Sequence, residues 1–277
     1  MKFTKMHGIG NDYIYFNCME ESIENPEELS VKLSRYHFGI GADGIVLIMP
    51  SETADFRMRM FNADGSEGKM CGNASRCIGK YVYEKGLTKK KEITLETLSG
   101  IKHLTLNVEG EKVTSVRIDM GEPIFRASEI PVSSDQETVI DSEVQIGDQR
   151  VRGTCVSMGN PHFVVFTQGI DELDLEKIGP GYENAPVFPD RINTEFAEVI
   201  SPTLIKMRVW ERGSGETLAC GTGACAVAAA AAACGISPED TFITVRLRGG
   251  DLRICRQSGG SVIMEGPAAF VFDGELL

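Results

Sequence analysis

Two cysteines carry the strongest chemical signal in the sequence, because each follows a glycine-containing loop and directly precedes an expected helix. Cys71 stands before the helix expected over residues 73–85, and Cys220 before the helix expected over residues 222–234. A helix N-terminus presents backbone N–H groups without intrahelical partners and the positive end of the helix dipole. We therefore expect the pKa of each thiol to lie below its usual value of about 8.5. The first helical N–H groups are also able to hold a carboxylate; they belong to Gly72, Asn73, Gly221 and Thr222.

The two cysteines occupy equivalent positions in an internal repeat. An offset of 149 residues places Cys71 on Cys220, and from residue 57 to residue 88 the register needs no gap. Six of these 32 positions are identical, where chance gives roughly two. The same offset places Asn11 on Asn160. These matches together predict a duplicated unit.

Paired thiols at equivalent helix starts favour the inversion of a stereocentre. A duplication with pseudo-twofold symmetry is able to place one thiol on each side of a carboxylate bound between the two helices. One thiolate then removes a proton from one face of the α-carbon, and the other thiol returns a proton to the opposite face. Because the α-proton of an amino acid is weakly acidic, stabilisation of the enediolate at the carboxylate is the larger expected effect. Either cysteine taken alone also fits a buried small residue.

The sequence offers little support for other thiol or metal chemistry. No pair of cysteines has the C-x-x-C spacing, and none of the four histidines pairs with another at helical spacing, so neither a metal site nor a cofactor is expected. The other six cysteines are interpreted as small core residues; they are Cys18, Cys77, Cys155, Cys225, Cys234 and Cys255.

Several polar residues lie near the two cysteine loops and allow two interpretations. Asn11 and Asn160 each follow a glycine, and asparagine tolerates the left-handed turns that also suit these positions. Asn62 fits a turn as well as a ligand contact. The adjacent charges of Glu211 and Arg212 could bind an ammonium and a carboxylate, or form a solvated strand end. His162 could tune a neighbouring thiol, or be a hydrogen-bonded core residue.

The periodicity predicts many strands and one long helix in each repeat. Gly86 and Gly235 follow these helices, where a left-handed residue ends a helix, and the second helix is almost entirely alanine over residues 224–233. We expect an α+β fold (α/β, two domains) that is internally duplicated, in which each pseudo-symmetric domain is a mainly antiparallel sheet wrapped around a central helix. The expected strands are residues 13–16, 45–49, 56–61, 92–98, 103–108, 163–166, 196–200, 204–210, 242–247 and 252–255.

Composition excludes several classes of function. The chain has 277 residues, 42% of them hydrophobic, and a formal net charge of −12. This acidity argues against a nucleic-acid-binding protein and against an anionic membrane surface as a partner. No stretch of 18 apolar residues is present, and the first residues lack the apolar core of a signal peptide, so we expect a reducing cytoplasmic location with free thiols.

The residues discussed above resemble the diaminopimelate epimerase family, with motifs that cover nearly the whole chain in the family's order. The resemblance implies a metal-free, pyridoxal-phosphate-independent enzyme that converts LL-2,6-diaminopimelate to the meso form for lysine and peptidoglycan synthesis. The motifs are KMHGIGNDY at 5–13, FNADGSE at 61–67, MCGN at 70–73, SMGNPH at 157–162, NTEF at 193–196, VWERGSGET at 209–217 and ACGTGAC at 219–225.

The resemblance also implies a role for each matching residue. Cys220 would accept the α-proton of the LL isomer and Cys71 would donate a proton to the other face. The first amides of both helices (Gly72, Asn73, Gly221 and Thr222) would hold the reacting carboxylate, and Glu211 and His162 would adjust the pKa values of the thiols. The residues that would hold the substrate, chiefly at its distal end, are Asn11, Asn62, Asn160, Asn193 and Arg212.

The family's architecture implies a C-terminal strand that returns to the first domain. We therefore expect domains at 1–118 with 266–277 and at 119–265, the active site in the cleft between them, and a homodimer. Residues 119–150 are expected to connect the repeats. Two positions depart from the family's pattern: Gly44 stands where some members have glutamine, and Ala74-Ser75 replaces a glycine-containing sequence, which leaves the tightness of that turn open.

Three alternatives remain from the sequence. A proline or hydroxyproline racemase of the same fold also uses two cysteines, although a cyclic imino acid offers no second amino acid group for the distal set to bind. A non-catalytic amino-acid-binding protein would use the same helix starts. A thiol redox sensor would use a bridge between Cys71 and Cys220 to change its binding to a partner.

Overall fold

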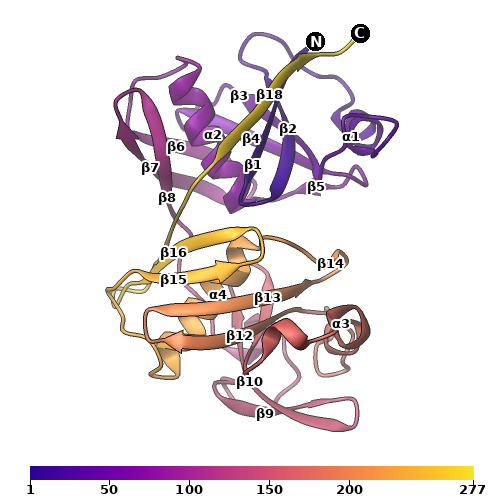
Figure 1. The fold of residues 1–277 in the computed structure, drawn as a ribbon, viewed down its shortest axis with the longest axis vertical. Coiled ribbons are helices and arrows are strands. Elements are labelled where there is room, and N and C mark those ends of the chain that lie inside the picture. The colour runs from indigo at the N-terminus through magenta and orange to yellow at the C-terminus, as the bar shows by residue number, and fades with distance from the viewer. The chain divides into compact units, whose positions relative to one another are not determined.

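The computed structural model describes residues 1–277, which divide into two compact units (Figure 1). Unit 1 comprises Met1–Asp119 and Glu265–Leu277, and unit 2 comprises Met120–Met264. Both cuts lie one residue from the boundaries expected from the sequence. Residues 120–150, expected to connect the repeats, are part of unit 2. None of the helices is both long enough and apolar enough to span a membrane.

Unit 1 contains two α-helices and strands from both ends of the chain. In chain order these are β1 (Lys2–Gly8), β2 (Asn11–Asn17), α1 (Pro26–Ser34), β3 (Gly44–Met49), β4 (Phe56–Asn62), β5 (Glu67–Gly68), α2 (Gly72–Glu84), β6 (Glu92–Thr97), β7 (Gly100–Glu109), β8 (Lys112–Asp119) and β18 (Ala269–Glu275). Figure 1 shows β18, in yellow, running beside β1, in indigo.

Unit 2 repeats this order after a short extension. Its elements are the 3-10 helix η1 (Ala127–Glu129), β9 (Ser142–Ile146), β10 (Gln149–Ser157), β11 (Pro161–Phe166), the 3-10 helix η2 (Ile170–Glu172), α3 (Leu175–Glu183), β12 (Asn193–Ser201), β13 (Leu204–Glu211), β14 (Gly215–Glu216), α4 (Gly221–Ala233), β15 (Ile243–Leu247) and β16 (Gly250–Arg256). The strand β17 (Val262–Gly266) runs across the boundary at the end of this unit.

The strand pairing confirms the duplication. In unit 1, β2 pairs parallel with β3, β3 antiparallel with β4, and β4 parallel with β6. In unit 2, the same order appears as β11 with β12, β12 with β13, and β13 with β15. The helices α2 and α4 begin and end at positions 149 residues apart. The other pairs with a known register are antiparallel, so the expected mainly antiparallel sheets are confirmed.

Each unit wraps its sheet around one central helix, as predicted. The helix α2 contacts β1, β2, β7 and β8, and α4 contacts β10, β11, β12, β15 and β16. From Ala224 to Ala231 every residue of α4 is at most 2% exposed. A helix that is apolar on all sides belongs in a core, and alanine allows the surrounding strands to approach it closely. Both central helices end at a glycine with positive φ, Gly86 at 79° and Gly235 at 70°.

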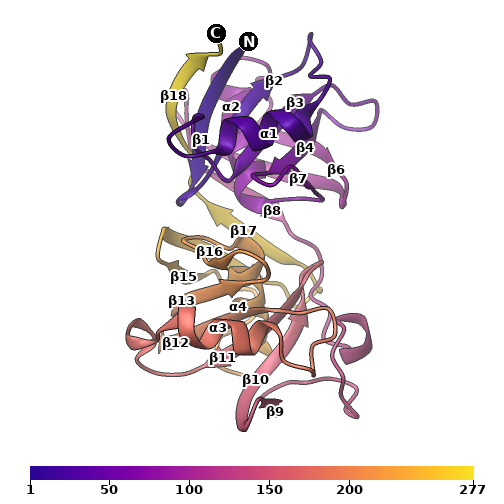
Figure 2. The same cartoon turned by 90° about the vertical axis from the view of Figure 1, so that its right-hand side faces the viewer.

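The shorter helices α1 and α3 pack on the strands of their own unit and were not predicted. Figure 2 shows α1 across β3 and β4, and α3 across β12 and β13. Residues 175–183 contain two glycines and Pro180, a composition typical of a loop. Here Asp174 caps the first turn by accepting a hydrogen bond from the Lys177 N–H. The strand β1, which pairs with both β2 and β18, was also not predicted.

Candidate active site

Cys71 is the N-cap residue of α2. Its backbone is extended, with φ −137° and ψ 119°, and its Sγ accepts a hydrogen bond from the Ala74 N–H at 3.5 Å. The Ser75 N–H donates to the Cys71 carbonyl at 2.9 Å. Capping therefore occupies the amides of Ala74 and Ser75, and the helix begins with the two residues before them, Gly72 and Asn73. The Ala74-Ser75 departure from the family's pattern thus forms a regular capped turn.

Asn11 lies beside the Cys71 thiol at the start of β2. Its Oδ1 accepts hydrogen bonds from the Cys71 thiol at 3.5 Å and from Asn73 Nδ2 at 3.2 Å. Its Nδ2 donates to Asp43 Oδ2 at 2.7 Å. Three predicted site residues of unit 1 are therefore joined directly, and Asp43 is an additional member that the sequence did not single out.

Asn62 reaches the same end of the sheet from another strand. The strands β2 and β3 begin there and β4 ends there, because β3 is parallel to β2 and antiparallel to β4. Asn62 Nδ2 donates to Ser66 Oγ at 3.0 Å, which fixes the turn after β4. Gly44 is the strand partner of Asn62, and a Cβ at Gly44 would lie 2.0 Å from the Phe61 carbonyl oxygen. No side chain fits at Gly44 unless the backbone moves.

Cys220 is the N-cap residue of α4, in the geometry that Cys71 has on α2. Its φ and ψ are −119° and 106°, and its Sγ accepts from the Gly223 N–H at 3.4 Å. The Thr222 hydroxyl lies 3.6 Å from the same sulfur. The Ala224 N–H donates to the Cys220 carbonyl at 3.0 Å, so the capping bonds leave the amides of Gly221 and Thr222 at the helix start.

The pKa of the Cys220 thiol is raised, not lowered. Burial raises this pKa well above its usual value, and the carboxylates of Glu211 and Glu195 raise it further. The hydrogen bonds from Thr222 and Gly223 act in the opposite direction and are weaker. The expectation of a lowered thiol pKa is therefore wrong for Cys220, because desolvation and two carboxylates outweigh the helix N-terminus.

His162 and Asn160 form a hydrogen-bonded chain with the helix start of α4. His162 Nε2 lies 3.0 Å from Asn160 Oδ1, and Asn160 Nδ2 donates to Thr222 Oγ1 at 3.3 Å. On the other side of the ring, His162 Nδ1 lies 2.7 Å from Glu195 Oε1, and both side chains are fully buried. Glu195 was missed as a site residue although it lies in the NTEF stretch, because its burial beside His162 cannot be seen in the sequence.

Glu211 and Thr217 complete the surroundings of Cys220. The Thr217 hydroxyl donates to the Glu211 carboxylate, and the neighbouring Cys220 thiol lowers the pKa of this carboxyl. Burial raises the pKa of Glu211, and the negative charge of Glu195 adds to this rise. A neighbouring thiol and carboxyl group whose pKa values are both raised are suited to exchanging a proton.

Asn193 and Arg212 are joined through the backbone at the start of β12 and the end of β13. The Arg212 N–H donates to Asn193 Oδ1 at 2.9 Å, and Asn193 Nδ2 donates to the Pro161 carbonyl at 2.8 Å. The Arg212 guanidinium donates to the Asp190 carbonyl at 2.8 Å. These contacts hold both residues at the end of the sheet where α4 begins.

The other cysteines have no comparable setting. All eight are free thiols, and five of the six interpreted as core are buried. Cys234 is the exception, because it is half-buried at the C-terminal end of α4. Burial raises the pKa of Cys18 to about 11 and that of Cys77 to about 12.

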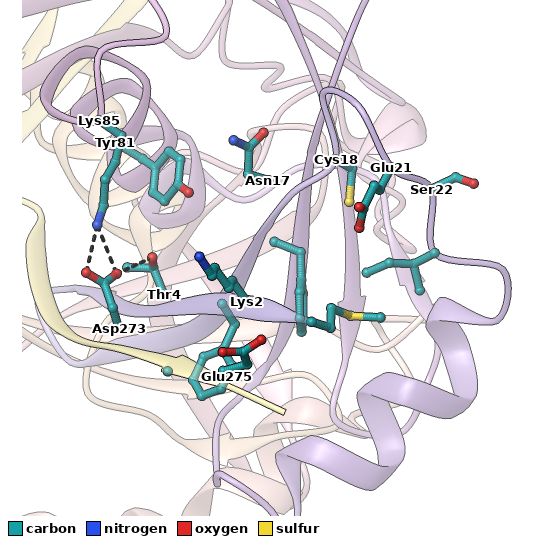
Figure 3. A pocket seen from close by; sticks show the side chains of 15 residues that line it. Lys2, Thr4, Asn17, Cys18, Glu21, Ser22, Tyr81, Lys85, Asp273 and Glu275 are labelled. Carbon is teal, nitrogen blue, oxygen red and sulfur yellow. Dashed lines mark hydrogen bonds and ion pairs between the residues drawn. The ribbon is translucent and has the colours of Figure 1, made fainter. Parts of the chain in front are cut away.

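A groove of about 980 Å³ in unit 1 lies apart from these helix starts (Figure 3). It is lined by β1, β18, the loop after β2 and the C-terminal end of α2. Polar side chains that line this groove bond to one another: Lys85 Nζ donates to Asp273 at 2.8 Å, and the Thr4 hydroxyl donates to the same carboxylate at 2.6 Å. None of the predicted site residues lines it.

Comparison with known proteins identifies close relatives. The family model described as diaminopimelate epimerase matches residues 3–126 and 154–271. The diaminopimelate epimerase of Acetivibrio thermocellus is 58% identical, over all of this chain and 98% of the relative.

Solved structures of lower identity share the fold. A PhzF-family phenazine biosynthesis protein of Bacillus anthracis superposes with a TM-score of 0.73 at 18% identity, over 100% of this chain and 99% of that one. A hydroxyproline epimerase of Agrobacterium vitis gives a TM-score of 0.71 at 15% identity, over 100% and 90% of the two chains. The expected two-domain α/β fold is therefore confirmed.

Proposed function

The chain belongs to the diaminopimelate epimerase family, whose members are isomerases, and on that premise we propose that it converts LL-2,6-diaminopimelate to the meso form by transferring protons between two thiols. The observation that carries this proposal is the equivalence of Cys71 and Cys220. Each caps the central helix of one repeat, with two helical amides next to it. Two cysteines that served only as small core residues would not be expected to occupy the same position in both repeats.

The proposed site lies between the two repeats, with the substrate's α-carbon between the thiols. The amides of Gly72 and Asn73 on one side, and of Gly221 and Thr222 on the other, hold the reacting carboxylate and stabilise the enediolate that forms when the α-proton leaves. The distal amino acid end binds to the polar residues at the ends of the two sheets, namely Asn11, Asn62, Asn160, Asn193 and Arg212.

In the proposed reaction on the LL isomer, Cys220 is the base and Cys71 the acid. The Cys220 proton passes to Glu211, the carboxylate beside it. The Cys220 thiolate takes the α-proton, and the Cys71 thiol gives its own proton to the opposite face. The cysteines exchange roles in the reverse direction. His162, held by Glu195, keeps Asn160 in place beside Thr222.

The test follows proton exchange and inversion separately. LL-diaminopimelate is incubated in deuterated water under reducing conditions, and deuterium at the α-carbon and the meso product are measured by mass spectrometry and chiral separation. We expect exchange with inversion in the wild type, and loss of inversion in Cys71→Ala and in Cys220→Ala. Cys225→Ala is the matched control, because Cys225 is a buried thiol one turn further along α4.

Other outcomes identify the alternatives. Exchange with proline but not with diaminopimelate would transfer the proposal to a racemase of cyclic imino acids. Absence of exchange with both would leave a binding or redox-sensing protein.

In the proposed reaction the rate requires one ionised and one protonated thiol, so the pH profile of the rate is bell-shaped, with pKa values that belong to the pair. A profile that is flat from about pH 6 to pH 9.5 would contradict the two-thiol reaction.

The proposed setting of the enzyme is the reducing cytoplasm, in lysine and peptidoglycan precursor synthesis, as a homodimer. Eight free thiols suit a reducing compartment. Support for association comes from β18, which presents Val271 and Phe272 at 54% and 47% exposure, since exposed apolar side chains on an edge strand favour pairing with another chain. Sedimentation velocity over a wide concentration range tests the dimer.

A further inference from the structure

Asp43 lies in the loop directly before β3 and is held against the start of β2. Its Oδ2 accepts from Asn11 Nδ2 at 2.7 Å and from the Asp12 N–H at 3.1 Å. Its own N–H donates to the Asp12 carbonyl at 2.9 Å. These bonds give the Asp43 carboxylate a fixed place two hydrogen bonds away from the Cys71 thiol.

The Asp43 carboxylate decides which end of the Asn11 amide faces Cys71. An ionised carboxylate only accepts hydrogen bonds, so the NH₂ group of Asn11 must face it. The oxygen of the same amide is then turned away from Asp43, toward the Cys71 thiol and Asn73 Nδ2. The orientation of Asn11 thus follows from its partner's charge.

Arg76 fixes the other end of the same chain. It is fully buried on α2, and its Nη2 donates to Asn73 Oδ1 at 2.8 Å. A guanidinium only donates, so the NH₂ group of Asn73 must face Asn11. The two charged ends therefore require the same direction of donation, from Arg76 through Asn73 and from Asn11 to Asp43, and bonds of this kind reinforce one another.

We propose that Asp43 is a positioning residue which, through the amide of Asn11, holds Cys71 as the protonated thiol of the catalytic pair. An amide oxygen accepts a hydrogen bond from S–H but is repelled by a thiolate. Cys71 is thus prepared to give a proton and Cys220 to take one. This assignment of acid and base rests on the proposed function, whereas the protonation of Cys71 does not.

The equivalent asparagine of unit 2 is turned the other way. Asn160 directs its NH₂ group to Thr222 Oγ1, and its oxygen faces His162 Nε2. The Thr222 hydroxyl, which accepts from Asn160, is left to donate to the Cys220 sulfur. The two asparagine side chains therefore face the two thiols with opposite ends. Asn11 presents an acceptor to Cys71, whereas Asn160 donates to Thr222, whose hydroxyl donates to Cys220.

Other charged and titratable groups lie near this series of hydrogen bonds, and a control variant must separate their effect from that of Asp43. Near Asp43 these are Asp12 and Lys5, which form an ion pair with each other, and Tyr36; near Cys71 they are Tyr15 and Cys77. Loss of any negative charge here favours a thiolate. Asp12→Asn removes a neighbouring negative charge while leaving Asn11 bonded to Asp43, so it measures this charge effect alone.

The experiment measures the alkylation of Cys71 by iodoacetamide as a function of pH, without substrate, by mass spectrometry. Cys234, half-buried on unit 2, is the internal reference. In Asp43→Asn the Asn11 amide loses the charge that fixes its NH₂ group and keeps only the bond from Asn73 Nδ2, so it is able to turn its NH₂ group toward sulfur. We expect the pH midpoint of Cys71 alkylation to fall by about one unit, as for one hydrogen bond gained by the thiolate, and by much less in Asp12→Asn.

An unchanged midpoint in Asp43→Asn, or a fall equal to that in Asp12→Asn, would overturn the inference. Thermal unfolding checks that the variants fold, and Asp43→Ser supplies the same comparison if Asp43→Asn does not. Failure of the proposed function is distinguished by a separate result, the absence of α-proton exchange with diaminopimelate in the wild type.

Discussion

The two helix starts are equivalent in backbone but differ in the side chains that surround each sulfur. The repeat offset pairs His162 with Tyr13 and Glu195 with Val46, and the strand registers agree, since Val164 lies opposite Glu195 as Tyr15 lies opposite Val46. Only the Cys220 side therefore has a buried carboxylate and imidazole. Duplication supplied two similar thiols, and substitution around them placed a buried carboxylate and an imidazole beside one of the two.

Gly223, the third residue of α4, shows how closely the groups around Cys220 pack. A Cβ at Gly223 would lie 2.7 Å from Glu195 Oε1 and 3.2 Å from Cys220 Sγ. We expect Gly223→Ala to push Glu195 away from His162 and to reduce kcat by about 100-fold, the usual cost of displacing a site group by about 1 Å. Steady-state kinetics on purified protein measure this.

The equivalent position in unit 1 provides the control. Ala74 is fully buried there, and the residue equivalent to Glu195 is Val46. Ala74→Gly should keep kcat within about twofold and lower the free energy of unfolding by about 0.5–1 kcal/mol through backbone entropy. A larger kinetic effect from Ala74→Gly than from Gly223→Ala would contradict this account.

Burial also predicts how the alkylation of each thiol depends on pH. Burial favours the neutral thiol, so the pKa of Cys18 rises to about 11 and that of Cys77 to about 12. We expect iodoacetamide at pH 8 to modify Cys71 and Cys234, the half-buried thiols, well before these two. Labelling of Cys18 should increase only as the pH approaches 11. Unfolding in guanidinium should remove the difference, and rapid labelling of native Cys77 at pH 8 would count against it.

At the scale of elements, Glu84 fastens the C-terminal end of α2 to β8. It accepts hydrogen bonds from Lys80 Nζ at 2.7 Å and from the Val113 N–H at 2.8 Å. Burial raises the pKa of Glu84, but the hydrogen bonds from Lys80 and Val113 outweigh it, and the net pKa is lowered. A carboxylate with a lowered folded-state pKa stabilises the fold above its unfolded value of about 4.3, and this contribution is lost as the pH falls through the lowered pKa.

Glu84→Gln should therefore destabilise the protein in a pH-dependent manner. We expect a loss of about 1–2 kcal/mol at pH 7, as for hydrogen bonds to a charged group, which lowers the Tm by about 3–6 °C. Calorimetry should show the difference from wild type shrinking below about pH 4. Glu109→Gln, at an exposed position of β7, is the matched control and should change Tm little. A difference that is constant from pH 7 to pH 3.5 would exclude the proposed charge effect.

Elements with strong periodicity or composition could be predicted from the sequence, and those defined by tertiary contacts could not. The alanine run of α4 and the β-branched run of β3 specify their structures locally. The helix α3 contains Pro180 between two glycines and is stabilised by its packing on β12 and β13. The strand β18 has a partner more than 260 residues away in sequence, which no local pattern indicates.

The same division applies to the candidate site. Cys71 and Cys220 were found because the repeat and the helix starts are both visible in the sequence. Asp43 and Glu195 bond to other side chains, Asn11 and His162, and a residue whose hydrogen bonds reach a thiol only through other side chains has no signature in one sequence. The raised pKa of Cys220 likewise depends on burial by distant segments.

At the scale of the whole molecule, both ends of the chain belong to unit 1. The strand β18 pairs with β1 from Lys2↔Glu275 to His7↔Ala269, with one irregularity after Lys5 (Figure 1). The Phe272 ring meets the edge of Phe3 at 5.9 Å, and Phe270 contacts Tyr81 of α2 at 6.3 Å. The last strand thus covers the first strand and part of the central helix, so its removal should destabilise unit 1.

Truncation after Pro267 tests this directly, because it removes β18 but keeps the Pro267 carbonyl that accepts from Arg76 Nε at 3.2 Å. Without β18, half of the β1 amides lose their partners and Phe3 and Tyr81 lose their aromatic contacts. Since amide exchange reports local opening, hydrogen exchange should become faster in β1 and in the C-terminal half of α2, while α4 and β13 keep their protection. Removal of Leu277 alone, a fully exposed residue, should change neither unit. Equal loss of protection in α4 and α2 would mean that the two units unfold as one cooperative body, and would contradict the expectation that the loss of β18 affects unit 1 alone.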